Sequence, residues 1–503
     1  MKKPKGTRVL FVQPWNYHDE GVQQFDHDNA WRNGPYNLIL LATLLNNAGH
    51  TAVISDLSRK LIGNAGDVER TLHDFGNDIS TFKPDIIAIS FFSIHYFEVK
   101  RIVGEARQVC AKVNISPMFV GGGIHPTVAP ETCLDDLGFD YAFVGEGDIG
   151  ILKLADGARP ATVFGAIGKS NRLFANGNKG EQVQDLNDLA FPDWSLVDYK
   201  FYSHPSYARL GFEKVGSLDL IMGRGCVYDC SFCAYQVLSA VRFYTADYLF
   251  EQMLYMMKSF DVRAFYFTDS TIGNNRKVLR ELCELIIRKG FGRKIVWLAN
   301  IRPNQINEEQ LRLMWRAGCR YLLYGFESNS QRMLDLMSKK CTVQDNETCA
   351  ALHNKLMFPY NASMLFGYPG EREDDLLQTI EFIKRFNPPS VGINWYVPLP
   401  GSPDYDKLKA DGVINTDNPE EWRLIGQVNE ARCYADMEYA RFRELYDLAC
   451  LHAYSEIPKT VYPVWAEHHK KGTTLKNLYS VRTVFKNVYS HIPRLLGMSP
   501  ARS

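Results

Sequence analysis

Two stretches of the chain alternate short apolar runs with segments of helical periodicity, and this alternation constrains the fold more than any other feature. In the first 150 residues the apolar runs are VLFVQP, TAVISD, IIAISFF, MFVGGG and YAFVGEGD, and helical segments at 35–49 and 98–112 lie between some of them. Strands that alternate with helices of about 10–15 residues are typical of parallel βαβ units. The sequence therefore predicts an α/β fold that begins with a doubly wound, Rossmann-like parallel sheet.

A second series of the same kind begins near residue 217, after a turn-rich stretch that loses the alternation. Its apolar runs are SLDLIMGRG, FYFTDS, IVWLANIRP, YLLYGFES, ASMLFGYPG and VGINWYVPLPGSP. Six βα units are too few for a closed eight-stranded barrel, so we expect a partial (β/α)6 barrel resembling a TIM barrel. We divide the chain into a sheet domain (1–150), a linker segment (151–215), the partial barrel (216–415) and a helical C-terminal region (416–503).

Composition and charge exclude several classes of protein. Lys+Arg and Asp+Glu are equal at 57 each, so net charge gives no attraction to nucleic acid. No apolar run approaches the roughly 18 residues needed to span a membrane. The start, MKKPKGTRVLFVQP, lacks the longer apolar core and the cleavage site of a signal peptide. We expect a cytoplasmic monomer with no nucleic-acid partner.

Three of the eleven cysteines are crowded into the segment GRGCVYDCSFCAYQ, directly after a predicted strand. Cys226, Cys230 and Cys233 have the spacing Cys-x3-Cys-x2-Cys, which could bind three corners of one compact metal centre. Iron–sulfur clusters are normally held by four cysteines, yet the next one, Cys283, lies in a predicted helix. One iron would then keep an open position, as catalytic metals do. The alternative is a zinc site, although zinc usually needs a second ligand pair and none is evident.

The solitary cysteines are a different class. Single thiols in helical or strand-like contexts are usually small core residues of a protein from a reducing compartment. We expect this of Cys110, Cys133, Cys283, Cys319, Cys349 and Cys450.

The cysteine loop, with Phe232 just before the third cysteine, resembles the signature of the radical S-adenosylmethionine enzymes. The resemblance implies a [4Fe-4S] cluster whose fourth iron chelates the amino and carboxylate groups of S-adenosylmethionine. Reductive cleavage of the sulfonium then yields a 5′-deoxyadenosyl radical. It also implies an external electron donor of the flavodoxin or ferredoxin type.

The downstream strand ends resemble the same family in their order and spacing. Strand-end motifs near the cofactor are FTDST, FGYPGE and PLPGSP, while GFES resembles the motif that contacts S-adenosylmethionine. Each motif also has a plainer interpretation, since Glu327 could cap a helix or pair with a cation, and Pro-Gly could serve turn formation alone. The resemblance implies cofactor contacts for Phe232, Asp269, Asn300, Arg302 and Glu327.

The first 150 residues resemble the cobalamin-binding domain that precedes many radical S-adenosylmethionine domains. The matching stretches include GPYNLILLATLLNNAGH, FKPDIIAISFFS, VGGGIHPTVAPE and FVGEGD. Glycines after a buried strand let the backbone approach a large ligand closely, and ligands of such sheets bind outside the carboxyl ends of the strands. The alternative is a flavodoxin-like domain with another nucleotide or no cofactor. The candidate cobalamin contacts are Gly121, Gly122, Gly123, His125, Gly145, Glu146 and Gly147.

The classical methyl-carrier cobalamin proteins supply a histidine to cobalt from an Asp-x-His-x-x-Gly motif, which this chain lacks. We therefore assign no residue as the lower ligand of cobalt. His125 lies in a different context, GGGIHPT, and we expect it to pack or to form hydrogen bonds near the cofactor.

Together these features predict a cobalamin-dependent radical S-adenosylmethionine methyltransferase, which acts on an unactivated carbon of a small-molecule or lipid-like substrate. One alternative is an oxidative cyclase with the same cofactors, like the anaerobic cyclase of magnesium-protoporphyrin monomethyl ester. Another is a non-enzymatic iron–sulfur or zinc protein. The last 30 residues place basic and apolar side chains on alternating helical faces, which suits a docking helix or peripheral contact with a membrane.

Overall fold

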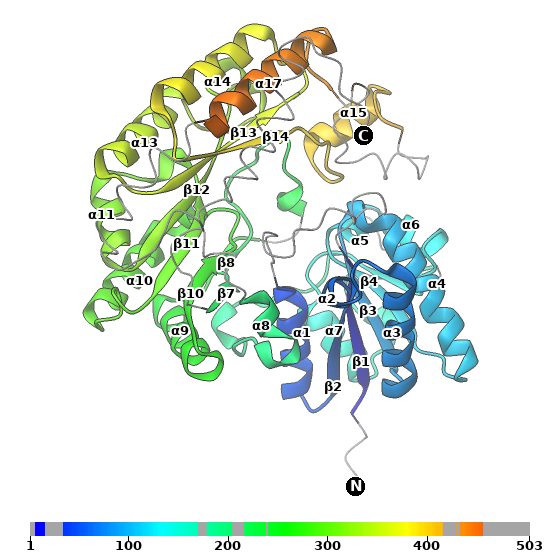
Figure 1. The fold of residues 1–503 in the computed structure, drawn as a ribbon. Helices are drawn as coiled ribbons and strands as arrows, with labels where there is room; N and C mark the ends of the chain where they lie inside the picture. Colours follow the sequence, from blue (N-terminus) through cyan, green and yellow to red (C-terminus); the bar gives the residue numbers. More distant parts are fainter. Residues whose placement is uncertain are drawn as a thin grey trace.

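The structure is a computed structural model that describes residues 6–15, 34–169, 179–203, 216–237, 240–415, 430 and 433–455. Figure 1 shows two α/β units, an N-terminal one in blue and cyan and a larger curved one in green and yellow. The predicted α/β fold class is confirmed.

The N-terminal unit is a six-stranded sheet in the order β2-β1-β3-β4-β5-β6. The first five strands are parallel, and only β6 runs antiparallel to its neighbour. The interior residues of β1 are all buried, as expected for a strand covered by helices on both faces. The strands are β1 (Arg8–Gln13), β2 (Thr51–Asp56), β3 (Ile86–Ser90), β4 (Met118–Gly122), β5 (Tyr141–Phe143) and β6 (Ala166–Gly168).

Seven helices connect and cover these strands within the described residues. They are α1 (Tyr36–Asn47), α2 (Leu57–Gly63), α3 (Val68–Phe82), α4 (Tyr96–Lys112), α5 (Ile124–Val128), α6 (Pro130–Asp135) and α7 (Asp148–Ala155). The sequence did not predict β6, which extends the sheet past residue 150. A strand of three residues is too short to show a hydrophobic period.

The second unit is a sheet in the order β14-β13-β12-β11-β10-β7, with every neighbouring pair parallel. Consecutive strands are neighbours, and β7 and β14 are the two edges, so this is the predicted partial barrel of six strands. Most of the helices between its strands follow the outer, convex side of the sheet (Figure 1). The strands are β7 (Gly216–Leu220), β10 (Val262–Phe267), β11 (Val296–Ile301), β12 (Cys319–Glu327), β13 (Tyr360–Phe366) and β14 (Ser390–Trp395).

The barrel helices follow from amphipathic patterns with good caps. In α10, for example, Asn275 accepts a hydrogen bond from the backbone N–H of Val278, and Leu279, Leu282 and Ile286 are buried. The helices are α8 (Tyr199–Tyr202), α9 (Ala246–Phe260), α10 (Arg276–Arg288), α11 (Glu308–Arg316), α12 (Gln331–Leu336), α13 (Val343–Leu356), α14 (Glu373–Phe386), α15 (Pro403–Ala410) and α17 (Tyr439–Ser455).

The core between the barrel sheet and its helices contains three of the six solitary cysteines, Cys283, Cys319 and Cys349. None of the eleven cysteines forms a disulfide, and the six predicted core thiols are all at most 5% exposed. Trp297 is fully buried in the same core, and its indole N–H donates to the carbonyl of Ala317 at 2.9 Å. The prediction that these thiols are core residues is confirmed.

Helix α17 represents the C-terminal region within the described residues. It packs on α14 and β14, where the ring centroids of Phe442 and Trp395 are 4.8 Å apart. The His-rich stretch AEHHKKG and the basic amphipathic segment that follows it lie outside the described residues. In the part of the chain that the structure describes, no helix is both long and apolar enough to cross a membrane.

Asp219, a fully buried carboxyl group on β7, predicts a pH dependence of stability. It accepts a hydrogen bond from the backbone N–H of Gly34 at 3.0 Å, but burial raises its pKa from 3.8 to about 7. Between these two values the folded protein holds a proton that the unfolded chain has lost, so the free energy of unfolding falls as pH rises. We expect Asp219→Asn, which keeps an acceptor, to remove part of this slope in thermal melts from pH 4 to 8. An unchanged slope would contradict this account.

Candidate active site

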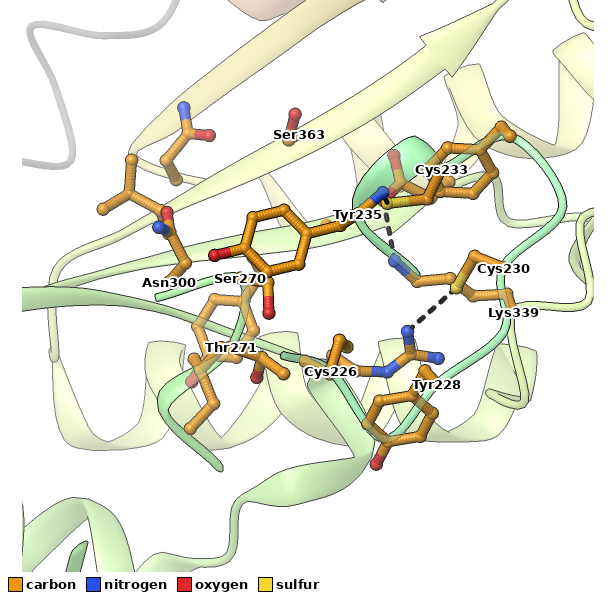
Figure 2. Close-up of a pocket in the computed structure, with 18 residues that line it drawn as sticks. Cys226, Tyr228, Cys230, Cys233, Tyr235, Ser270, Thr271, Asn300, Lys339 and Ser363 are labelled. Carbon is orange, nitrogen blue, oxygen red and sulfur yellow. Dashed lines mark hydrogen bonds and ion pairs between the residues drawn. The ribbon is translucent and has the colours of Figure 1, made fainter. Parts of the chain in front are cut away.

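The three clustered cysteines lie in a loop framed by a two-stranded antiparallel ribbon, β8 (Gly223–Arg224) and β9 (Arg242–Phe243). All three line one pocket of about 290 Å³ at the carboxyl ends of the barrel strands. Figure 2 shows Cys230 and Cys233 on the right of this pocket, Ser270, Thr271 and Asn300 from the ends of β10 and β11 on the left, and Cys226 between them. The loop thus places its thiols where chemistry occurs in parallel α/β folds.

Four of the other predicted barrel residues line the same pocket, namely Phe232, Asn300, Arg302 and Glu327. Asp269 does not line it. Its carboxylate accepts hydrogen bonds from the backbone N–H groups of Met222 and Gly223, at 2.8 and 2.9 Å. Full burial raises the pKa of Asp269 to about 7. Asp269 therefore anchors the base of the ribbon, and the next two residues of its motif, Ser270 and Thr271, line the pocket instead.

Arg302 contacts the cysteine loop directly. Its Nη1 donates to Cys230 Sγ at 3.2 Å, and its guanidinium lies 3.7 Å from the centroid of the Tyr228 ring. Its Nε and Nη2 are buried and have no hydrogen-bond partner in the described part of the chain. Buried donors normally form hydrogen bonds, so these two nitrogens indicate that a polar ligand binds in the pocket.

Glu327 pairs with Lys339, a residue that no motif in the sequence indicates. The ammonium and the carboxylate are 2.7 Å apart, and both side chains are largely buried. Glu327 also has a positive φ of 63°, a conformation that is uncommon for a residue with a side chain. Lys339 lies before α13 and outside any motif, so only the fold could bring it here.

The glycine loop of the N-terminal sheet lies against the cysteine loop. Gly123 follows β4 with a φ of 99°, and a Cβ there would meet Phe91 O and Ser90 Oγ at 2.9 Å. The short helix α5 begins directly after it and contacts η8 (Ala234–Val237), the turn that follows Cys233. The two candidate cofactor loops are therefore neighbours.

His125 is buried in the N-terminal core. Its ring nitrogens lie 2.9 Å from Ser93 Oγ and 2.7 Å from Thr132 Oγ1, and its ring stacks on Phe91. Burial lowers its pKa to about 3, so the ring is neutral. In this structure His125 supports the glycine loop from inside the domain.

The second glycine loop, after β5, contains Gly145, Glu146 and Gly147. Gly145 has a φ of 88° and donates its N–H to Thr127 Oγ1 at 3.0 Å. The carboxylate of Glu146 pairs with Arg224 and Arg242, so it contacts the barrel unit rather than an open crevice.

Comparison with known proteins identifies both units. Residues 33–155 match the B12 binding domain, and residues 220–383 match the radical SAM superfamily. The chain combines a B12-binding domain with a radical SAM domain. The cofactor set predicted from the sequence, a [4Fe-4S] cluster with S-adenosylmethionine and cobalamin, agrees with this combination.

Its sequence relatives include a methyltransferase and an oxidative cyclase, and each aligns with most of this chain. An uncharacterised methyltransferase of Pyrococcus horikoshii is 22% identical over 81% of this chain and 85% of its own length. The anaerobic magnesium-protoporphyrin IX monomethyl ester cyclase of Rubrivivax gelatinosus is 25% identical over 80% of this chain and 70% of its own length.

Two solved structures share the fold of this B12-binding radical SAM chain. The radical S-adenosylmethionine methyltransferase TsrM from Kitasatospora setae, with cobalamin and a [4Fe-4S] cluster bound, has a TM-score of 0.64 at 17% identity. It covers 88% of this chain and 91% of its own. The cobalamin-dependent enzyme OxsB, with aqua-cobalamin and S-adenosylmethionine bound, has a TM-score of 0.67 at 16% identity, over 99% and 74% of the two chains.

Proposed function

We propose that this protein is a cobalamin-dependent radical S-adenosylmethionine methyltransferase that acts on an unactivated carbon of a small-molecule substrate. One observation carries the proposal. The three-cysteine loop at the mouth of the radical SAM barrel lies against the glycine loop of the B12-binding domain, which supports two cofactors bound side by side.

The donor set fits an iron–sulfur cluster better than a zinc ion. A zinc site needs ligand atoms within about 2.3 Å of one ion. In the described ranges, no three His, Cys, Asp or Glu side chains converge closely enough to hold a single ion. The cysteines nevertheless line one pocket, as ligands of a larger cluster would. Cys226, Cys230 and Cys233 would hold three irons, and Arg302 would offset the negative charge of the thiolates.

The remaining pocket residues fit S-adenosylmethionine. Cluster and S-adenosylmethionine together supply a 5′-deoxyadenosyl radical when bound, and the corrinoid supplies the methyl group. The chain's share is to orient these groups and to exclude water. Asn300 and Glu327 offer hydrogen bonds at the strand ends, while Tyr228 and Phe232 of the cysteine loop line the same pocket with aromatic rings. The candidate corrinoid contacts are the glycine loops after β4 and β5.

Arg302 provides a test of the cluster site that does not depend on turnover. A hydrogen bond and a positive charge near a thiolate sulfur stabilise the reduced cluster. We expect Arg302→Met, which removes both, to shift the cluster potential negative by on the order of tens of millivolts. Arg302→Lys, which keeps the charge, should shift it less. Redox titration monitored by electron paramagnetic resonance measures both, and equal potentials in all three proteins would refute the contact.

The related cyclases make oxidative ring closure the second candidate function. Anaerobic turnover with methyl-labelled S-adenosylmethionine and a cell extract separates the two. A product that gains the labelled methyl group supports methyl transfer. Release of 5′-deoxyadenosine with an unlabelled, oxidised product would favour cyclisation. A cluster spectrum without cleavage of S-adenosylmethionine would favour a non-enzymatic metal protein. The reaction would draw electrons from a flavodoxin or ferredoxin.

A further inference from the structure

Two arginines lie directly opposite each other at the base of the cysteine loop. Arg224 on β8 is the register partner of Arg242 on β9. Directly opposed residues of an antiparallel pair project from the same face of the ribbon, and like charges there are destabilising. Both side chains are also largely buried, with 14% and 12% of their surface exposed. The ribbon therefore needs anions from another part of the molecule.

The N-terminal domain supplies these anions. Arg224 Nη1 lies 2.9 Å from Glu146 Oε2, and its Nη1 and Nη2 bind the two carboxylate oxygens of Asp148 at 2.8 and 2.9 Å. Arg242 pairs with the other oxygen of Glu146. Although burial alone would lower the pKa of Arg224, these carboxylates raise it overall. Two cations and two anions thus form one balanced network across the domain boundary.

The network joins the two cofactor loops at close range. On the barrel side, Arg224 lies two residues before Cys226, and Asp269 accepts a hydrogen bond from the backbone N–H of Gly223 in the same ribbon. On the other side, Glu146 lies between Gly145 and Gly147 in the second glycine loop. The N–H of Gly145 is bound by Thr127 of α5, the helix that contacts the turn after Cys233.

We propose that Glu146, Asp148, Arg224 and Arg242 form an inter-domain lock, which fixes the cysteine loop in position relative to the corrinoid-side glycine loops. The proposal rests on the proposed function in assuming that the two loops hold the two cofactors. These four side chains are positioning residues, because they act through the loops that they join. Removing one partner from a buried network leaves a charge without its counterion, so the boundary should loosen.

Arg242 is the best position to test, because it binds only the carboxylate of Glu146 and backbone carbonyls among its described contacts. Arg242→Gln removes the cation, and Arg242→Lys restores a charge that can reach Glu146. Arg441→Gln is the matched control, since it removes an arginine from an exposed pair with Glu373 on the outer helices.

The first measurement is hydrogen–deuterium exchange of the full-length protein, followed by mass spectrometry. We expect Arg242→Gln to increase exchange about tenfold in two places only, the ribbon strands at 222–225 and 241–244 and the loop 144–150. Arg242→Lys should recover most of the protection, and Arg441→Gln should leave both segments as in the wild type. Unchanged exchange in Arg242→Gln, or an equal increase throughout the protein, would overturn the lock.

The second measurement uses the protein loaded with cluster and corrinoid and given methyl-labelled S-adenosylmethionine. We expect Arg242→Gln to release 5′-deoxyadenosine within about twofold of the wild type, while labelling of the corrinoid falls about tenfold. A parallel loss of both would contradict a positioning role. If the wild type itself labels no corrinoid, the proposed function fails, whereas the exchange result still decides on the lock.

Discussion

Serine at both Cys230 and Cys233 is expected to leave the anaerobically reconstituted protein without its iron–sulfur cluster. Both thiols line the pocket, and serine hydroxyl groups are poor substitutes for thiolate ligands. Iron content should drop to background, and reductive cleavage of S-adenosylmethionine should fall by about 10³-fold or more, which corresponds to ~4 kcal/mol. Iron analysis, the ultraviolet–visible spectrum and quantification of 5′-deoxyadenosine measure these effects.

Cys433 offers a matched control for this pair. It is half-buried and lies outside the pocket. In the sequence it follows the last barrel strand and precedes α17. Cys433→Ser should retain the full iron content and the cleavage rate of the wild type. A normal cluster spectrum in the Cys230→Ser, Cys233→Ser protein would show that the site assignment is wrong.

Alanine at Gly123 is expected to abolish retention of the corrinoid while the cluster site survives. The new Cβ would meet Phe91 O and Ser90 Oγ at 2.9 Å, and the φ of 99° is unfavourable for alanine. The loop after β4 must then move, and with it the backbone that we expect to approach the corrinoid. We expect corrinoid content after anaerobic purification to fall at least about tenfold, whereas iron content stays within about twofold.

Gly104→Ala is the same substitution at a harmless position in the same domain. Gly104 lies on the exposed side of α4, where an added Cβ has nothing within 4 Å. Alanine there should stabilise the helix by about 0.5–1 kcal/mol and leave corrinoid content unchanged. Equal corrinoid content in the Gly123→Ala and Gly104→Ala proteins would show that the glycine loop after β4 does not belong to the corrinoid site.

The architecture could be predicted from the sequence because each strand carries its own signal. The run VLFVQP became β1 within one residue at each end, and the six apolar runs of the second series became the six barrel strands. Covered parallel strands read as continuous apolar runs, which makes them easy to find. The cysteine spacing is equally local, so the pocket thiols could be located without a structure.

The remaining site residues depend on contacts between distant segments, which no local pattern encodes. Lys339, in the loop before α13, pairs with Glu327 at the end of β12, and no motif in the sequence indicates this contact. Asp269 resembled a cofactor contact, but its carboxylate is used by two backbone N–H groups of the ribbon. Glu146 belonged to a glycine-rich motif, yet its partners are 78 and 96 residues away in the other domain.

One labelling measurement tests whether this protein uses both cofactors for methyl transfer. Protein purified anaerobically with cluster and corrinoid is incubated with methyl-labelled S-adenosylmethionine and a low-potential reductant. We expect label in the corrinoid fraction and 5′-deoxyadenosine from the same preparation. Release of 5′-deoxyadenosine from corrinoid-loaded protein, with no label in the corrinoid, would contradict it.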